Sequence, residues 1–284
     1  MRDQHRSFTS DLVAAMRAFY SEAPADLDVA SDPVASSLLP LPLTLLVRAM
    51  GQPGVARLVH HALGHASFGL SYGVPLRTAA IDEVLRDEAS RGCEQLVLLG
   101  AGLDARGYRL PELGDCTVFE LDHPSTQGYK RLRVGSLEPL ARAVHFCSID
   151  FERQSIGEVL GGAGFITQQK SCWIWEGVTM YLTPGAIDAT LDAVSLYSAP
   201  GSVLCMTYVT PESGIVRRAG LISAGKIREP ILGTLSQKEV QERLERRGFS
   251  LLSDTDAHDW ARRYWPKAPG GLRVWERLVV ARRA

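Results

Sequence analysis

LLGAGLDARGYRL, residues 98–110, is the stretch of this 284-residue sequence that decides the fold. It follows the apolar run 95–99, and Gly100 and Gly102 fit a tight turn between a strand and a helix. In open α/β proteins, the turn after the first strand is where ligands bind. The stretch therefore predicts an α/β fold and places a ligand site at the turn.

Seven apolar runs typical of β-strands follow position 91. Four of them (LVLL, VFEL, WIW and VLCMTYV) lack polar alternation, as strands buried on both faces of a parallel sheet do. Helical patterns such as 184–197 and 236–247 lie between the runs. Residues 91–284 are therefore predicted to form an open, doubly wound α/β domain with a seven-stranded, mostly parallel sheet. The predicted strands are 95–99, 116–121, 143–149, 171–175, 201–209, 249–253 and 273–281.

Two other segments do not belong to this strand and helix alternation. The first ninety residues show helix signals and no strand-like pattern, so residues 1–90 are predicted to form an N-terminal helical cap. The segment 210–235, between the fifth and sixth predicted strands, mixes Gly, Pro and Arg. We interpret it as a lid, because long connections in compact folds are usually functional or disordered. The helix signals of the cap lie at 9–20, 34–50, 54–68 and 77–91.

Composition narrows the class of protein. The chain has 31 Lys and Arg against 32 Asp and Glu, so its net charge of −1 gives no excess for nonspecific binding of nucleic acid. The apolar stretch 34–50 is interrupted by Pro40, Pro42 and Arg48 and is too short to span a membrane. No export signal is visible, and the five cysteines show no metal-ligand spacing. We therefore expect a cytoplasmic protein without a bound metal and without a nucleic-acid or membrane partner.

The glycine turn fits a dinucleotide by spacing. Gly100, Gly102 and Ala105 satisfy G-x-G-x-x-G/A, and Asp122 lies twenty residues past Gly102, at the end of the second predicted strand. This spacing alone does not exclude an NAD(P)-dependent oxidoreductase.

Charge at the turn favours a different ligand. The helix after the turn begins with Asp104, where a pyrophosphate would need N–H groups without a competing carboxylate. S-adenosylmethionine (SAM) carries a sulfonium, a ribose diol and an adenine amine but no phosphate, so acidic strand ends suit it. A structural interpretation stays open for each acid, since Asp104 could cap its helix and Glu120 could pair with Lys130 or Arg131. The acids at the strand ends are Glu120, Asp122, Asp150 and Glu176.

Three motifs resemble the leucine carboxyl methyltransferase family and its bacterial SAM-dependent relatives. They are LGAGLDARGYRL at 99–110, FELDHP at 119–124 and WEGVTMYLT at 175–183. The resemblance runs from about position 11 to about position 264. It implies the Rossmann-like fold of class I SAM-dependent methyltransferases and SAM as the cofactor.

The resemblance also implies a set of cofactor-binding residues. Arg77 matches an arginine that binds the carboxylate of the methionine part of SAM, and Arg17 matches a basic residue that helps it. Asp122 matches the acid that holds the ribose hydroxyls. Glu176 matches a glutamate near the methionine part and the methyl-transfer centre. The remaining matches are Gly100 and Gly102 beneath the cofactor, and Asp150 with Phe151 beside the adenine.

The chemistry of methyl transfer favours a carboxylate acceptor. A carboxylate has a pKa of ~4 and is already ionised at neutral pH, whereas a phenol with a pKa of ~10 would need a general base. No histidine lies in a recognisable catalytic motif, and the bacterial relatives are often linked to small-molecule and natural-product methylation. We therefore expect a SAM-dependent O-methyltransferase that converts a small carboxylic acid to its methyl ester. A phenol or hydroxyl O-methyltransferase, an NAD(P)-dependent oxidoreductase and a non-catalytic SAM-binding protein remain alternatives.

Tyr181 and Tyr208 are candidate acceptor-pocket residues. Tyr181 follows Glu176 by about one helical turn, and Tyr208 ends the fifth predicted strand at the root of the predicted lid. Both are interpreted equally well as core aromatics. His61 and His65 are spaced by four residues but have no acidic or Cys partner nearby in the sequence, so no metal site is predicted there.

Overall fold

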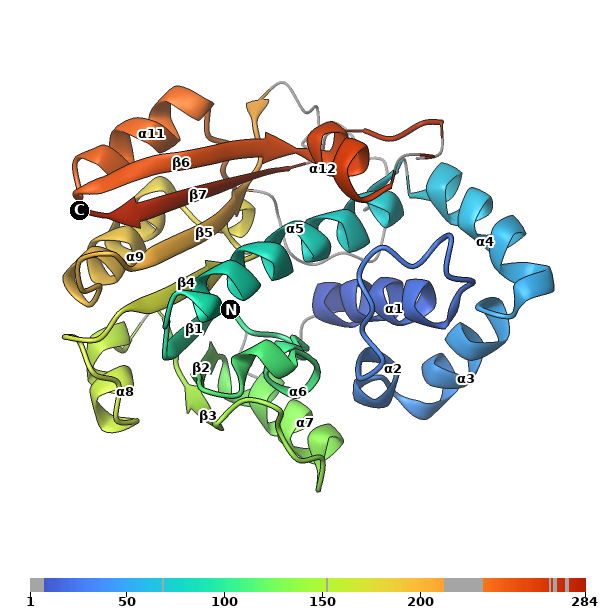
Figure 1. Cartoon of the computed structure of the whole chain (residues 1–284), viewed down its shortest axis with the longest axis horizontal. Coiled ribbons are helices and arrows are strands. Elements are labelled where there is room, and N and C mark those ends of the chain that lie inside the picture. The colour runs from blue at the N-terminus through green and yellow to red at the C-terminus, as the bar shows by residue number, and fades with distance from the viewer. Residues whose placement is uncertain are drawn as a thin grey trace.

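A seven-stranded sheet forms the centre of the molecule in the computed structural model (Figure 1). The strand order is β3-β2-β1-β4-β5-β7-β6, in which β1 to β5 pair in parallel and β7 runs antiparallel between β5 and β6. This confirms the predicted doubly wound, mostly parallel α/β fold. The strands are β1 Gln95–Leu99, β2 Thr117–Asp122, β3 Ala143–Ser148, β4 Ser171–Trp175, β5 Val203–Tyr208, β6 Phe249–Asp256 and β7 Arg277–Arg283. The structure describes residues 8–67, 69–151, 153–211, 232–265, 267, 270–273 and 276–284.

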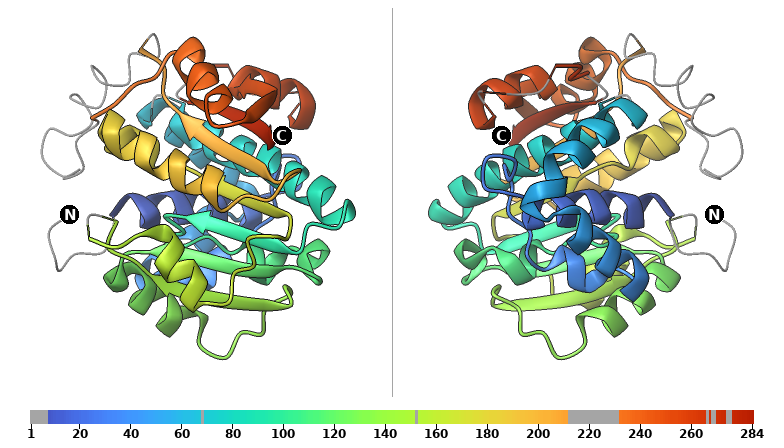
Figure 2. Two further views of the ribbon diagram at one scale, coloured as in Figure 1. Left: turned by 90° about the vertical axis from the view of Figure 1, so that its left-hand side faces the viewer. Right: turned by 90° about the vertical axis from the view of Figure 1, so that its right-hand side faces the viewer.

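Within the described residues, five helices precede the first strand, where the sequence pattern predicted four, because the predicted helix at 34–50 is divided into Ala35–Leu38 and Leu41–Met50. In Figure 2, right, the helices drawn in blue, between residues 8 and 66, lie toward the viewer on one side of the sheet. The helices are α1 Phe8–Glu22, α2 Ala35–Leu38, α3 Leu41–Met50, α4 Pro53–Ala66 and α5 Leu70–Ser90, followed by α6 Arg106–Arg109, α7 Pro124–Val134, α8 Ile156–Gly162, α9 Pro184–Leu196, α11 Gln237–Glu245 and α12 Ala257–Tyr264, with 3₁₀ turns at Pro111–Leu113 and Thr179–Tyr181.

Three element boundaries differ from the sequence prediction. Helix α5 begins at Leu70, seven residues before the predicted start, and contains Pro75 in its interior, a residue that normally marks a helix boundary. The helix after the glycine turn is only one turn long, because Leu110 precedes a proline and adopts extended backbone (φ −101°, ψ 102°). Strands β6 and β7 continue through polar positions, where Arg277 of β7 pairs with Asp254 of β6 at 2.8 Å.

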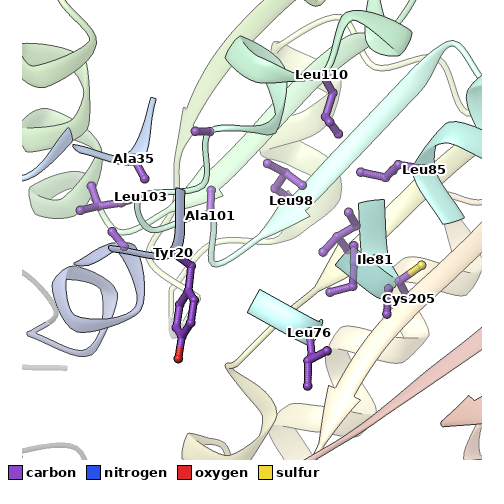
Figure 3. Close-up of a cluster of buried hydrophobic side chains, with 14 of the residues drawn as sticks. Tyr20, Ala35, Leu76, Ile81, Leu85, Leu98, Ala101, Leu103, Leu110 and Cys205 are labelled. Carbon is purple, nitrogen blue, oxygen red and sulfur yellow. The ribbon is translucent and has the colours of Figure 1, made fainter. Parts of the chain in front are cut away.

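The core has two parts, one on each face of the sheet. Alternate residues of β1 belong to different buried clusters, Leu96 and Leu98 to one and Val97 and Leu99 to the other. The first cluster joins the sheet to α1 and α5, as Figure 3 shows for Leu98, Ile81 and Tyr20. The second packs the sheet against α8, α9 and α11. Because the first cluster spans the predicted boundary at position 90, the cap and the sheet share one core.

Two further predictions concern segments outside the sheet. Most of the predicted lid at 210–235 lies outside the described residues, which omit 212–231. In the part of the chain that the structure describes, none of the helices combines the length and apolar character needed to span a membrane.

Candidate cofactor site

The glycine turn follows β1 at the carboxyl edge of the sheet. Gly100 and Gly102 have φ angles of +70° and +51°, which residues with a Cβ rarely adopt. The N–H groups of Gly100 and Ala101 donate to the carbonyl of Leu121 at 2.8 and 3.0 Å, which fixes the turn beside β2. A Cβ on Gly100 would lie 2.7 Å from Cγ2 of Val178. The turn thus requires glycine for both its backbone conformation and its close packing.

Asp122 ends β2 directly beside the turn. Its Oδ2 accepts a hydrogen bond from the N–H of Gly102 at 2.5 Å, and its Oδ1 accepts one from the N–H of His123 at 2.6 Å. Burial raises the pKa of Asp122, while these two N–H donors act to lower it. Each carboxylate oxygen can accept a second bond, so the residue can hold the turn and also bind ribose hydroxyls. The turn and this acid therefore fit the nucleoside part of SAM.

Arg77 and Glu176, 99 residues apart in the sequence, form a buried ion pair. Nε of Arg77, on α5, donates to Oε1 of Glu176, which follows β4, at 2.6 Å. Nη1 of Arg77 donates to Oε1 of Glu276, which immediately precedes β7. The Arg77 side chain is only 6% exposed. The structure thus brings together the two residues that the resemblance assigns to the methionine part of SAM, and it adds a second carboxylate.

Arg106 supports Glu176 from the other side. Its Nη1 donates to Oε2 of Glu176 at 2.8 Å and also to Asp104, and its Nε donates to Asp82 at 2.7 Å. Burial alone would raise the pKa of Glu176, but the charges of Arg77 and Arg106 outweigh burial and hold that pKa well below its ordinary value. Glu176 is therefore a carboxylate at any neutral pH. Asp104 also accepts a bond from the N–H of Arg106, the first residue of α6, at 2.7 Å, although the N-cap position itself is occupied by Ala105.

Arg17 fixes the cap to the glycine turn. Its Nη2 donates to the carbonyl of Leu103 at 2.6 Å, and its Nε donates to Asp32 at 2.9 Å. Arg109 joins the same network, because it pairs with Asp82 at 2.7 Å and lies 3.5 Å from Asp32. Helix α1 is thereby held against the ligand-binding turn.

Glu120 has the structural role that was left open for it. It is fully buried on β2, and Nζ of Lys130 donates to its Oε2. Burial raises the pKa of Glu120 to about 7, although Lys130 acts to lower it. Of the acids predicted at the strand ends, Asp122, Asp150 and Glu176 remain as candidates for binding a ligand.

Asp150 and Phe151 follow β3, next to the end of β2. Register pairs Asp122 with Ser148, and the N–H of Ile149 donates to the carbonyl of Asp122 at 2.9 Å. Phe151 is 46% exposed. The strand order thus places an exposed aromatic ring one strand away from the acid predicted to bind the ribose, which suits an adenine beside it.

Comparison with known families decides the affiliation. The sequence profile of the leucine carboxyl methyltransferase family matches residues 11–195. The chain belongs to this family. The affiliation predicted from the three motifs is therefore confirmed.

Individual relatives agree with the family profile. A protein of Mycobacterium marinum, provisionally named an S-adenosyl-L-methionine-dependent methyltransferase, is 35% identical over 219 residues, which is 74% of this chain and 69% of the relative. A protein of Mycobacteroides abscessus with the same name is 35% identical over 241 residues, covering 84% of this chain and 74% of the relative.

Solved structures show the same fold at low sequence identity. A DUF574 family protein of Streptomyces avermitilis aligns with a TM-score of 0.63 at 11% identity and covers 99% of both chains. A protein of Thermobifida fusca, provisionally described as a methyltransferase, aligns with a TM-score of 0.58 at 16% identity and covers 93% of this chain and 96% of its own.

The two tyrosines predicted for the acceptor pocket differ in their surroundings. Tyr208, at the end of β5, is fully buried, and its hydroxyl donates to Oδ2 of Asp254 at 2.6 Å. Tyr181 ends the 3₁₀ turn before α9 and is partly exposed. Acceptor binding by either tyrosine stays a prediction, and the hydroxyl of Tyr208 already donates to a carboxylate of the protein itself.

Neither Arg106 nor Glu276 was predicted from the sequence to lie at the cofactor site. Arg106 lies within the stretch LLGAGLDARGYRL. A charged residue beside a buried turn needs partners of opposite charge, and this signal could have been read from the sequence. Glu276 offered none, since its partner Arg77 lies 199 residues away in the sequence.

Proposed function

We propose that the chain, a SAM-dependent methyltransferase of the leucine carboxyl methyltransferase family, methylates a carboxylate of a small acid. When bound, SAM supplies an electrophilic methyl group, so that the acceptor oxygen forms the new C–O bond as the C–S bond breaks and the electron pair stays on sulfur. The product is a methyl ester.

The observation that carries the cofactor assignment is the buried Arg77–Glu176 pair beside the glycine turn. The methionine part of SAM has a carboxylate and an ammonium group, and the pair presents one charge of each opposite sign. Asp122 lies at the nucleoside end of the same edge, and the exposed ring of Phe151 lies beyond it. A dinucleotide is less well served, because its pyrophosphate would meet Asp104 at the start of α6.

The protonation state of Glu176 supports a carboxylate acceptor. Methyl transfer to a phenol requires removal of a proton with a pKa of ~10, and an acid is a poor base when its own pKa is depressed. Arg77 and Arg106 hold the pKa of Glu176 far below its ordinary value, so this residue is a poor base. A carboxylate acceptor needs only alignment with the methyl group and removal of water.

The experiment is incubation with methyl-labelled SAM and matched acceptors, such as benzoate beside phenol and phenylacetate beside 2-phenylethanol. We expect label in the acids, released as methanol by mild alkali because methyl esters hydrolyse there. Label found only in phenols or alcohols, as alkali-stable ethers, would contradict the carboxylate assignment. Binding of SAM without transfer to any acid, phenol or alcohol would support a non-catalytic SAM-binding protein.

A further inference from the structure

Glu276 reaches the cofactor site from the far end of the chain. Strand β7 runs antiparallel to β5, and register pairs Arg277 with Tyr208. The residue before Arg277 therefore lies at the carboxyl end of β5, on the same edge of the sheet as Gly100 and Glu176. Its contact with Arg77 confirms this placement.

One carboxylate oxygen of Glu276 is not used by the residues that the structure describes. Oε1 accepts from Arg77, whereas Oε2 is buried and has no hydrogen-bond partner within the described ranges. The side chain as a whole is only 8% exposed. Buried polar atoms are nearly always paired, because leaving one unpaired is unfavourable, and more so when the group is charged. The free oxygen therefore calls for a donor that comes from a bound molecule.

The charge of the surrounding network points to the kind of donor. Arg77 is shared between Glu176 and Glu276, and Arg106 is shared among Glu176, Asp82 and Asp104. The ion-paired network as a whole contains one more carboxylate than arginine, so a cationic donor would balance its charge. The members of the network are Arg17, Arg77, Arg106, Arg109, Asp32, Asp82, Asp104, Glu176 and Glu276.

We propose that Glu276 is a second acidic binding residue of this site and that its free oxygen accepts a hydrogen bond from a primary ammonium group of a bound molecule. The proposal rests on the proposed function, which supplies two sources of such a group. One is the α-ammonium of SAM, and the other is an amino group on the acid that accepts the methyl. Arg77, held between Glu176 and Glu276, then holds both carboxylates in place.

Calorimetric titration with two nucleosides distinguishes these sources. S-adenosylhomocysteine retains the α-ammonium, whereas 5′-methylthioadenosine lacks the whole amino-acid part. If the group comes from the cofactor, Glu276→Gln weakens binding of S-adenosylhomocysteine about tenfold or more and leaves binding of methylthioadenosine unchanged. If the ammonium group comes from the acceptor, Glu276→Gln binds both nucleosides as tightly as the wild type does. The variant then loses the preference, measured as KM, for amino acids over the corresponding acids without an amino group.

Matched variants separate binding from folding. Glu88→Gln is the control variant. Glu88 is a buried glutamate on α5, the helix that carries Arg77, and it pairs with Arg91 and Arg282, so this variant should change neither titration. Glu276→Asp keeps the charge and should restore part of the affinity or preference. Unchanged binding of both nucleosides by Glu276→Gln, with unchanged preference among acids, would overturn the ammonium assignment alone. If the wild type bound neither nucleoside, the proposed function would fail and this proposal with it.

Discussion

Two buried polar regions of the molecule treat charge in opposite ways. At the carboxyl edge of the sheet, Arg106 and Arg77 are almost fully buried and remain charged through ion pairs. At the centre of the cap, His60 is 3% exposed and is surrounded by aromatic rings. Burial, with a further contribution from His61, lowers the pKa of His60 to about 4, so it is neutral at pH 7. Its ring contacts Tyr20, Tyr72 and Trp265, and its Nδ1 lies 3.1 Å from the Tyr20 hydroxyl.

We interpret the difference as a sign that the sheet edge, and not the centre of the cap, binds a ligand. Burying charges is expensive, and a well-packed apolar replacement is often as stable as a buried ion pair. The cap avoids a buried charge, because the ring of His60 is neutral and its Nδ1 lies within hydrogen-bond distance of the Tyr20 hydroxyl. The sheet edge keeps its charges, and an unpaired oxygen of Glu276 with them, where a zwitterionic amino-acid group is proposed to bind.

The largest effect is expected from removing the most buried cation of the charged region. Arg106→Ala leaves Asp82, Asp104 and Glu176 without a shared partner, and should lower the free energy of unfolding by about 3–5 kcal/mol. Arg86→Ala is the control, because Arg86 pairs with Glu112 at 2.9 Å but is 46% exposed, and it should cost less than about 1 kcal/mol. Urea unfolding measures both. Equal losses in the two variants would remove the basis for distinguishing a buried network from surface pairs.

A smaller effect is expected at the glycine turn. Gly100→Ala and Gly92→Ala both place a Cβ at positive φ, at a cost of about 1–2 kcal/mol each. Only at Gly100 does the new Cβ meet a neighbour, Cγ2 of Val178 at 2.7 Å, whereas nothing lies within 4 Å at Gly92. We therefore expect a further loss of about 1–3 kcal/mol for Gly100→Ala, and weaker SAM binding in this variant alone. If calorimetry found wild-type SAM affinity in Gly100→Ala, the glycine turn would not be part of the cofactor site.

The smallest effect is expected in the neutral region, as a pH dependence. The pKa of His60 is about 4 in the folded protein and about 6.5 when unfolded, so the unfolded state takes up the proton first as the pH falls. Stability should therefore decline by about 1–2 kcal/mol between pH 6.5 and pH 5 on account of this residue. His60→Asn should remove that decline, while replacement of His65, exposed on the same helix, should leave it in place. An identical pH profile in His60→Asn and the wild type would show that His60 takes up its proton as readily in the folded protein as in the unfolded chain, which would contradict the lowered pKa.

The fold was predictable where burial follows the local pattern. The continuous apolar runs of β1, β4 and β5 are buried at every position, so their sequence alone locates them. The C-terminal end of β6 was missed because Asp254 and Asp256 continue the strand through ion pairs with Arg277, which a search for apolar residues does not detect. Strand β7 begins at Arg277 rather than at 273, and it continues past 281 through Arg282 and Arg283. The start of helix α5 was predicted too late, because Pro75 lies inside the helix.

The site was predictable in the same uneven way. Gly100, Gly102 and Asp122 lie within two neighbouring motifs, and their mutual contact follows from the adjacency of β1 and β2. Family resemblance assigned Arg77 and Glu176 to the same part of SAM, but their ion pair was not predicted, since nothing local links a cap helix to the end of β4. The position of Glu276 at the site depends on where β7 joins the sheet, so it follows from the strand order and not from the local sequence.

The central claim is that the charged edge of the sheet is a SAM site, and calorimetric titration of the purified protein tests it most directly. We expect SAM and S-adenosylhomocysteine to bind with micromolar affinity, and expect Asp122→Ala and Arg77→Ala to abolish this binding while both variants remain folded by circular dichroism. Binding of NADH or NADPH, with no binding of SAM, would contradict the account and would mean that the glycine turn accepts a pyrophosphate despite Asp104.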